Sequence, residues 1–299
     1  MTIQQVVAKK LKLYARRRAV TLLDGNYDSV FKGKGIELES LRPYVQGDSV
    51  KDIDWKSTAR TGNVQTRLYT PLRDQRILVV IDCTSSMLLP SRSGMDKKDA
   101  LYGVIVTLGM FVNKNRDVIA SCIGRPDGSI NVGRFGNNNN HIEKILRNVD
   151  QSLQEGLRGR PPSMYSMLDR LKSSMKQRTA IFIVSDSTED QSELKPVLSK
   201  LGVKHQLFWM QIDPSSPFVK NPPYNQQIID IDSKHPINGS SMSKLLHSEW
   251  ETEISKLSDT RRRVCKSTGV AYGETYETDQ LLPEMRKMFI QARNYAKRH

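Results

Sequence analysis

The chain has 299 residues, of which 37% are hydrophobic and 26% are charged. This balance suits a folded domain with a packed core and excludes a chain that is mainly disordered. No run of about 18 apolar residues is present, so we expect no span across a membrane. The N-terminal segment lacks the apolar stretch of a secretory signal, and the odd number of cysteines (3) has no metal-type spacing. We therefore expect reduced thiols and a cytoplasmic protein.

The positive charge of the chain is its most unusual bulk property. Lysine and arginine number 46 against 32 acidic residues, which gives a net charge of +14. Such a balance raises nucleic acid or an acidic protein surface as partners, with an ordinary solvated surface as the alternative. The cations are spread over the N-terminal segment, residues 261–263 and residues 286–298, and no nucleic-acid-binding motif accompanies them. Nucleic-acid binding therefore stays the lesser hypothesis.

The N-terminal quarter of the chain does not show a regular pattern of strands and helices. We expect a helix over residues 1–22, where apolar residues recur at helical spacing among many cations. Residues 31–76 mix short strand-like pieces with glycine turns. This segment is short for a self-sufficient core, so we expect residues 1–76 to pack on a domain formed by residues 77–299. Ile53, Trp55 and Leu68 need a partner surface, and we place Trp55 in the core.

From residue 77 onward, strands and helices alternate. Continuous apolar runs predict strands buried on both faces of a parallel sheet at residues 77–81, 118–123, 180–184 and 206–212. Shorter strands are expected at residues 129–132 and, as an edge strand, at 227–231. Helices with one apolar stripe are expected from residue 99, at 142–153, from 163, at 194–201, and near 243–266 and 283–297. This order predicts a doubly wound, mostly parallel α/β sheet with an N-terminal extension and C-terminal helices.

Polar side chains follow two of the predicted central strands. The first strand runs into Asp82, Thr84 and Ser86, in the order Asp-x-Thr-x-Ser, and Asp186 follows the strand at 180–184. Because ligands bind beyond the carboxyl ends of the strands in such sheets, we expect these residues to converge on a solvent-facing loop. Carboxylates and hydroxyls are hard oxygen ligands suited to Mg²⁺ or Mn²⁺. The alternative is that Asp82 caps a helix and the hydroxyls belong to an ordinary polar loop.

A run of fixed spacings precedes this motif. Residues 37–60 read ELESLRPYVQGDSVKDIDWKSTAR, which contains Arg42-Pro43-Tyr44, Gly47-Asp48, Asp52-Ile53-Asp54-Trp55 and Ala59-Arg60. Followed by a strand and the Asp82-to-Met87 motif, this run resembles the signature of the family called domain of unknown function 58. The match is strong over residues 33–87 and loose over the rest to residue 200. The resemblance implies a von Willebrand factor A-like (Rossmann-like) domain, a metal-ion-dependent adhesion site and partnership with MoxR-type AAA+ ATPases.

The resemblance also assigns positions within the adhesion site. Asp82 and Ser86 match its first and third loop positions, and Asp186 matches its later aspartate. Thr84 replaces the usual serine and keeps the hydroxyl. Related domains carry a threonine in a middle loop, where this chain has only Ser163, and the register differs by about one residue. We therefore expect Mg²⁺ or Mn²⁺ to bind weakly or not at all.

These observations predict a protein-interaction module and not an enzyme. The metal would take an acidic side chain from the partner protein. A MoxR-type AAA+ ATPase as that partner, in a chaperone-like role in the assembly or remodelling of protein complexes, follows from the resemblance alone. The chain has no P-loop and no nucleophile-elbow motif. A metal-dependent hydrolase that uses Asp82 and Asp186 remains an alternative, although no general base is evident beside them.

Four charged residues of the signature admit a catalytic interpretation as well. They are Asp48, Asp52, Asp54 and Arg60. We expect them instead to form buried ion pairs and turn hydrogen bonds that join the N-terminal segment to the sheet.

Overall fold

The structure is a computed structural model of the chain. It describes residues 37–70, 75–157, 159–186, 193–214, 227–229, 236–238 and 244–296. The helix expected over residues 1–22 lies outside the described residues. None of the helices in these ranges combines the length and the hydrophobicity of a membrane-spanning segment.

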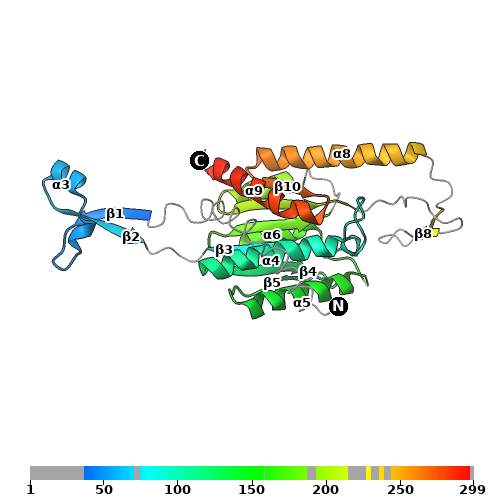
Figure 1. Cartoon of the computed structure of the whole chain (residues 1–299), viewed down its shortest axis with the longest axis horizontal. Coiled ribbons are helices and arrows are strands. Elements are labelled where there is room, and N and C mark those ends of the chain that lie inside the picture. Colours follow the sequence, from blue (N-terminus) through cyan, green and yellow to red (C-terminus); the bar gives the residue numbers. More distant parts are fainter. Residues whose placement is uncertain are drawn as a thin grey trace.

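A six-stranded sheet forms the centre of the molecule (Figure 1). Its strands are β3 (Arg76–Ile81), β4 (Val118–Gly124), β5 (Ile130–Val132), β6 (Ala180–Ser185), β7 (Gln206–Ile212) and β10 (Ala271–Thr275). Their order across the sheet is β10-β7-β6-β3-β4-β5. All neighbours pair in parallel except β5, which runs antiparallel to β4. The predicted doubly wound, mostly parallel sheet is confirmed.

Helices cover both faces of this sheet (Figure 1). They are α4 (Lys97–Asn115), α5 (Asn139–Gly156), α6 (Met164–Ser174), α7 (Leu194–Gly202), α8 (Lys244–Ser267) and α9 (Leu281–Ala296). Successive side chains of a strand point to opposite faces, so β3 feeds two cores. Ile77, Val79 and Ile81 pack with α4, α5 and α9, whereas Leu78 and Val80 pack with α6, α7 and α8. Burial on both faces explains why the central strands read as unbroken apolar runs.

The far edge of the sheet differs from the sequence prediction. Residues 227–231 were expected to supply the edge strand, but β8 (Gln227–Ile229) pairs with β9 (Pro236–Asn238) in a separate two-stranded sheet. The edge position belongs to β10, which pairs with β7. The sequence of β10, AYGET, lacks the apolar run of a central strand. Four of its five residues are nevertheless buried, and Ala271 and Tyr272 pack into the cores on opposite faces of the sheet.

Residues 37–70, the signature unit (blue in Figure 1), contain β1 (Glu37–Pro43), η1 (Val50–Asp52), α3 (Trp55–Thr61) and β2 (Gln65–Thr70). β1 and β2 form an antiparallel hairpin. The side chain of Trp55 is 64% exposed, so its placement in the core was wrong. Residues 71–74, which join the unit to β3, lie outside the described residues. The packing of residues 1–76 on the domain of residues 77–299 stays a prediction.

The signature aspartates bind partners inside this unit. Asp48 accepts hydrogen bonds from Arg42 and from the backbone N–H of Val45. Asp54 caps α3 by accepting from the N–H of Ser57, and it pairs with Arg67. These contacts hold the pKa of each carboxyl below its usual value. The turn and capping roles of Asp48 and Asp54 agree with the sequence prediction. The expected burial of their ion pairs was wrong, because the side chains of Arg42 and Arg67 are 37% and 43% exposed, and these contacts do not join the unit to the sheet.

Candidate metal and interaction site at the carboxyl edge of the sheet

Four side-chain oxygen groups meet where β3 and β6 end. The loop after β3 turns into the short helix η2 (Ser85–Leu88), and the Asp82 N–H still bonds to the Val184 carbonyl of β6. Thr84 donates to Asp82 Oδ1 from its N–H at 3.1 Å and from its hydroxyl at 2.8 Å. The Thr84 and Ser86 hydroxyl oxygens are 2.9 Å apart, and Ser86 Oγ donates to Asp186 Oδ1 at 2.9 Å. We call these four residues the oxygen cluster.

Both carboxylates of the oxygen cluster are buried, although the sequence predicted a solvent-facing loop. Asp82 is 5% exposed and Asp186 is 3% exposed. Ser185 Oγ donates to the second oxygen of Asp82 at 2.6 Å. Burial, followed by the negative charge of Asp186, raises the pKa of Asp82 to about 6. Thr84 and Ser86 are only half-buried, so these two residues form the less covered side of the cluster.

A lysine that the sequence analysis missed completes the site. Lys97, the first residue of α4, is fully buried. Its Nζ donates to Asp186 Oδ2 at 2.5 Å and to the backbone carbonyl of Ser86 at 3.1 Å. One signal was available: a lysine in the first turn of a helix opposes the helix dipole, which favours acidic residues there.

Ser163 does not join the oxygen cluster. It caps α6, accepting a hydrogen bond from the Ser166 N–H at 3.2 Å, and its hydroxyl lies 3.0 Å from that of Ser166. Its loop nevertheless lies at the same edge of the sheet. A Cβ added to Gly124, the last residue of β4, would come within 2.9 Å of Pro162 Cδ. Of the five residues assigned to a metal, the structure brings together Asp82, Thr84, Ser86 and Asp186.

The donor chemistry of the oxygen cluster fits a hard divalent cation. Mg²⁺ is commonly held by one or two carboxylates together with water, and the Thr84 and Ser86 hydroxyls add two neutral oxygens. The cluster has only two carboxylates. Among the described residues, no group of three or more His, Cys, Asp or Glu side chains gathers at one point. A metal here would therefore depend on the hydroxyls and on water, and its presence stays a prediction.

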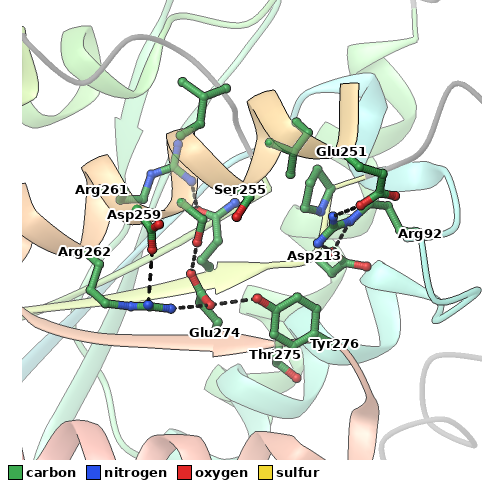
Figure 2. Close-up of a pocket in the computed structure, with 15 residues that line it drawn as sticks. Arg92, Asp213, Glu251, Ser255, Asp259, Arg261, Arg262, Glu274, Thr275 and Tyr276 are labelled. Carbon is green, nitrogen blue, oxygen red and sulfur yellow. Dashed lines mark hydrogen bonds and ion pairs between the residues drawn. The ribbon is translucent and has the colours of Figure 1, made fainter. Parts of the chain in front are cut away.

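A second polar feature lies further along the same edge, at the ends of β7 and β10. Arg92 binds Asp213 through Nη2 at 2.6 Å and Nε at 2.7 Å, and it reaches Glu251 of α8 at 3.0 Å. We call Arg92 and Asp213 the arginine–aspartate clamp. It borders a cavity of about 310 Å³ between α8 and these strand ends (Figure 2). Glu274 and Tyr276 also line this cavity, and they hydrogen bond to each other. The clamp ties the segment between η2 and α4 to the far side of the sheet.

The arginines at 261–263 do not form an open basic patch. Arg261 is 4% exposed, hydrogen bonds to Gln211 and lies over the Trp209 ring. Arg262 pairs with Glu274 and Asp259. Arg261 is therefore committed inside the protein, and Arg262, although its side chain is 56% exposed, is paired with two carboxylates. Both facts weaken the nucleic-acid hypothesis.

Comparisons with known proteins place the chain in a family. It is 22% identical to the uncharacterized protein Rv1480 of Mycobacterium tuberculosis over an aligned stretch of 207 residues. This stretch covers 68% of this chain and 63% of that protein. The uncharacterized protein YeaD of Bacillus subtilis is 23% identical over 164 residues, 53% of this chain and 36% of that protein. The chain thus spans less than two thirds of the length of either relative. A solved von Willebrand factor type A protein from Catenulispora acidiphila aligns with 77% of this chain and 45% of its own length, at 14% identity and a TM-score of 0.43.

The family model described as "Protein of unknown function DUF58" matches residues 40–216, more than half of the chain. The matched stretch contains most of the signature unit, the oxygen cluster and Lys97. The resemblance carried by the signature motif is confirmed. The chain belongs to the DUF58 family.

Proposed function

We propose that this chain is a protein-interaction module whose contact surface is the carboxyl edge of the sheet around the oxygen cluster. The main support for this proposal is the continuous line of hydrogen bonds from Asp82 through Thr84 and Ser86 to Asp186. It joins loops that are 100 residues apart in sequence. It lies where doubly wound sheets bind their ligands.

In this proposal a Mg²⁺ or Mn²⁺ ion takes part in the contact. The Thr84 and Ser86 hydroxyls and the Asp82 and Asp186 carboxylates would hold the ion, with water at the remaining positions. The ion would supply an open coordination position for a carboxylate of the partner. The half-buried positions of Thr84 and Ser86 support this arrangement, because an ion held beside these residues would be nearer to solvent than the covered carboxylates are.

We further propose that the partner is a MoxR-type AAA+ ATPase and that the pair acts in the assembly or remodelling of protein complexes. Support for this partner comes from the family resemblance. We expect no catalysis by the chain itself. The carboxylate oxygens of the oxygen cluster already accept from hydroxyl, backbone or ammonium donors, which suits binding better than proton transfer.

A pull-down with a MoxR-type ATPase from the same genome tests this proposal. Asp82→Asn keeps the shape of the side chain and removes its charge, and we expect it to abolish capture. Asp127→Asn is the matched control, because Asp127 is an exposed turn aspartate that follows β4 at the same edge. Chelation of divalent cations should abolish capture by the wild-type chain. Capture that survives both Asp82→Asn and chelation would contradict the proposal.

A further inference from the structure

Lys97 is the one fully buried lysine among the residues that the structure describes. Charged lysine side chains are almost never fully buried unless they are paired. Here the pair is short, with 2.5 Å between Lys97 Nζ and Asp186 Oδ2. Neither partner is on the surface, since the exposed fractions of the two side chains are 0% and 2%. This ion pair is therefore part of the interior of the site.

The contacts of Lys97 connect the same loops that a metal ion would connect. Its ammonium binds the Asp186 carboxylate at the end of β6 and the Ser86 carbonyl in η2. Asp96, which caps α4 by accepting from the N–H groups of Lys98 and Asp99, fixes the start of the helix that carries the lysine. Three separate segments are thus held by one cation that belongs to the chain itself.

The charge of the site changes accordingly. The two carboxylates alone would carry −2, and the Lys97 ammonium reduces this to −1. A divalent cation then brings the site to +1, where without Lys97 it would reach only neutrality. Repulsion between the ammonium and the metal weakens metal binding, and the resulting positive site suits the acidic side chain of a partner.

We propose that Lys97 is a built-in counter-ion of the metal site. It holds the Asp186 and Ser86 loops in place when no metal is bound, and it lowers the affinity of the site for divalent cations. This inference rests on the proposed function, because it concerns the same site. It goes beyond that function by naming the residue that sets metal affinity and metal-free order.

Binding of Mn²⁺ to the full chain, measured by titration calorimetry, tests the effect on affinity. Lys97→Met removes the charge, and we expect Mn²⁺ to bind at least about tenfold more tightly than to the wild-type chain. Lys98→Met is the matched control. It makes the same change of net charge in the same helical turn, but Lys98 is partly exposed and pairs with Asp150 instead. The control should bind Mn²⁺ as the wild-type chain does.

Thermal unfolding with chelator and with Mn²⁺ tests the effect on order. The wild-type midpoint should change little between the two conditions. The midpoint of Lys97→Met should fall in chelator and recover in Mn²⁺, because the metal replaces the missing cation. Lys97→Gln, which keeps a donor but no charge, should behave in the same direction. If neither variant folds at any Mn²⁺ concentration, the metal cannot replace the lysine and the inference is overturned.

These experiments distinguish failure of the Lys97 counter-ion role from failure of the metal-dependent interaction. Equal, measurable Mn²⁺ affinity in the wild-type chain and in Lys97→Met would overturn the role of Lys97 and leave the metal-dependent interaction standing. Absence of Mn²⁺ binding in all three proteins would remove the metal from the proposed function as well.

Discussion

The neighbouring strands β6 and β7 are each followed by a buried aspartate. Each aspartate pairs with a cationic side chain, and both cations come from residues 92–97. Asp186 follows β6 and binds Lys97, and Asp213 follows β7 and binds Arg92. The oxygens of Asp213 are held by donors of fixed geometry, with Arg92 on one oxygen and the Ser93 N–H on the other at 3.3 Å. One oxygen of Asp186 faces Ser86 instead, whose hydroxyl leads on to Thr84 and Asp82.

This difference separates a structural pair from a binding site. Guanidinium and backbone N–H groups only donate, so the groups that hold Asp213 in the arginine–aspartate clamp add no ligand oxygen for a cation. Hydroxyls both donate and accept, and they can turn their lone pairs toward an ion. The oxygen cluster therefore keeps ligand capacity that the clamp lacks. Four substitutions test how these parts of the molecule differ.

The largest effect is expected when the clamp is broken. Arg92→Met leaves the Asp213 carboxylate, whose side chain is 0% exposed, without its counter-ion. Loss of one partner of such a pair costs about 3–5 kcal/mol of unfolding free energy. Arg147→Met is the control, because its bond to Glu143 lies on the surface of α5 and is worth under about 1 kcal/mol. Urea unfolding measures both. Rescue of Arg92→Met by Mn²⁺ would contradict the assignment of the clamp as purely structural.

Gly156 packs against the loop that carries the oxygen cluster. It ends α5, and a Cβ there would lie 2.5 Å from the backbone oxygen of Cys83. Gly156→Ala must therefore shift the Asp82 loop or the helix, and we expect a loss of about 1–3 kcal/mol. Gly202→Ala ends α7 in the same way with its nearest contact at 3.4 Å, and it should be tolerated. Equal unfolding free energies for the two variants would refute this packing.

The raised pKa of Asp82 predicts a pH dependence of the metal-free chain. Because the folded pKa, about 6, lies above the ordinary value of 3.8, folding favours the protonated acid. This contribution to stability is fully present below pH 3.8 and is lost as pH rises through about 6. We expect this contribution to be on the order of 1–2 kcal/mol. It is smaller than the full pKa shift would give, because Asp82 is coupled to the neighbouring carboxylate of Asp186.

Urea unfolding in chelator at several pH values measures this dependence. Between pH 4 and pH 7 the unfolding free energy of the wild-type chain should decline more than that of Asp82→Asn. The other titratable groups contribute equally to both proteins, so the difference between the two declines belongs to Asp82. Asp127→Asn is the control, since hydrogen bonds from Ser129 lower the pKa of Asp127 and give the opposite sign. A decline of equal size in wild type and Asp82→Asn would assign it to other groups.

The smallest effect is expected in the signature unit. The side chain of Trp55 is 64% exposed, so Trp55→Ser should change the unfolding free energy by less than about 0.5 kcal/mol. Chemical unfolding followed by circular dichroism measures this change. A loss above about 2 kcal/mol would show that Trp55 packs on the domain of residues 77–299, as the sequence analysis predicted, and would contradict its exposed position.

Patterns along the chain predicted the central part of the fold well. The strands β3, β4, β6 and β7 were predicted because burial on both faces demands unbroken apolar runs. The edge strand β10 was missed because AYGET mixes polar residues and glycine with its buried positions. The strand at 227–229 was recognised, but its partner was not, since pairing depends on neighbours in space.

The candidate site was predicted only in part, for a related reason. Asp82, Thr84, Ser86 and Asp186 directly follow strands, and strand ends converge in a parallel sheet. Lys97 lies eleven residues after Ser86 at the start of a helix, where a lysine usually faces water. Only the packing of α4 beneath η2 brings it to Asp186.

Partner binding over a salt series, with Mg²⁺ or with chelator, tests whether the oxygen cluster binds its partner through a divalent cation. If the ion is itself a contact, capture of the MoxR-type ATPase should vanish on chelation at every salt concentration. A contact driven by the +14 net charge would instead weaken steeply with salt and ignore the chelator. The first result is the one that we predict, and the second would contradict a metal-dependent interaction at this site.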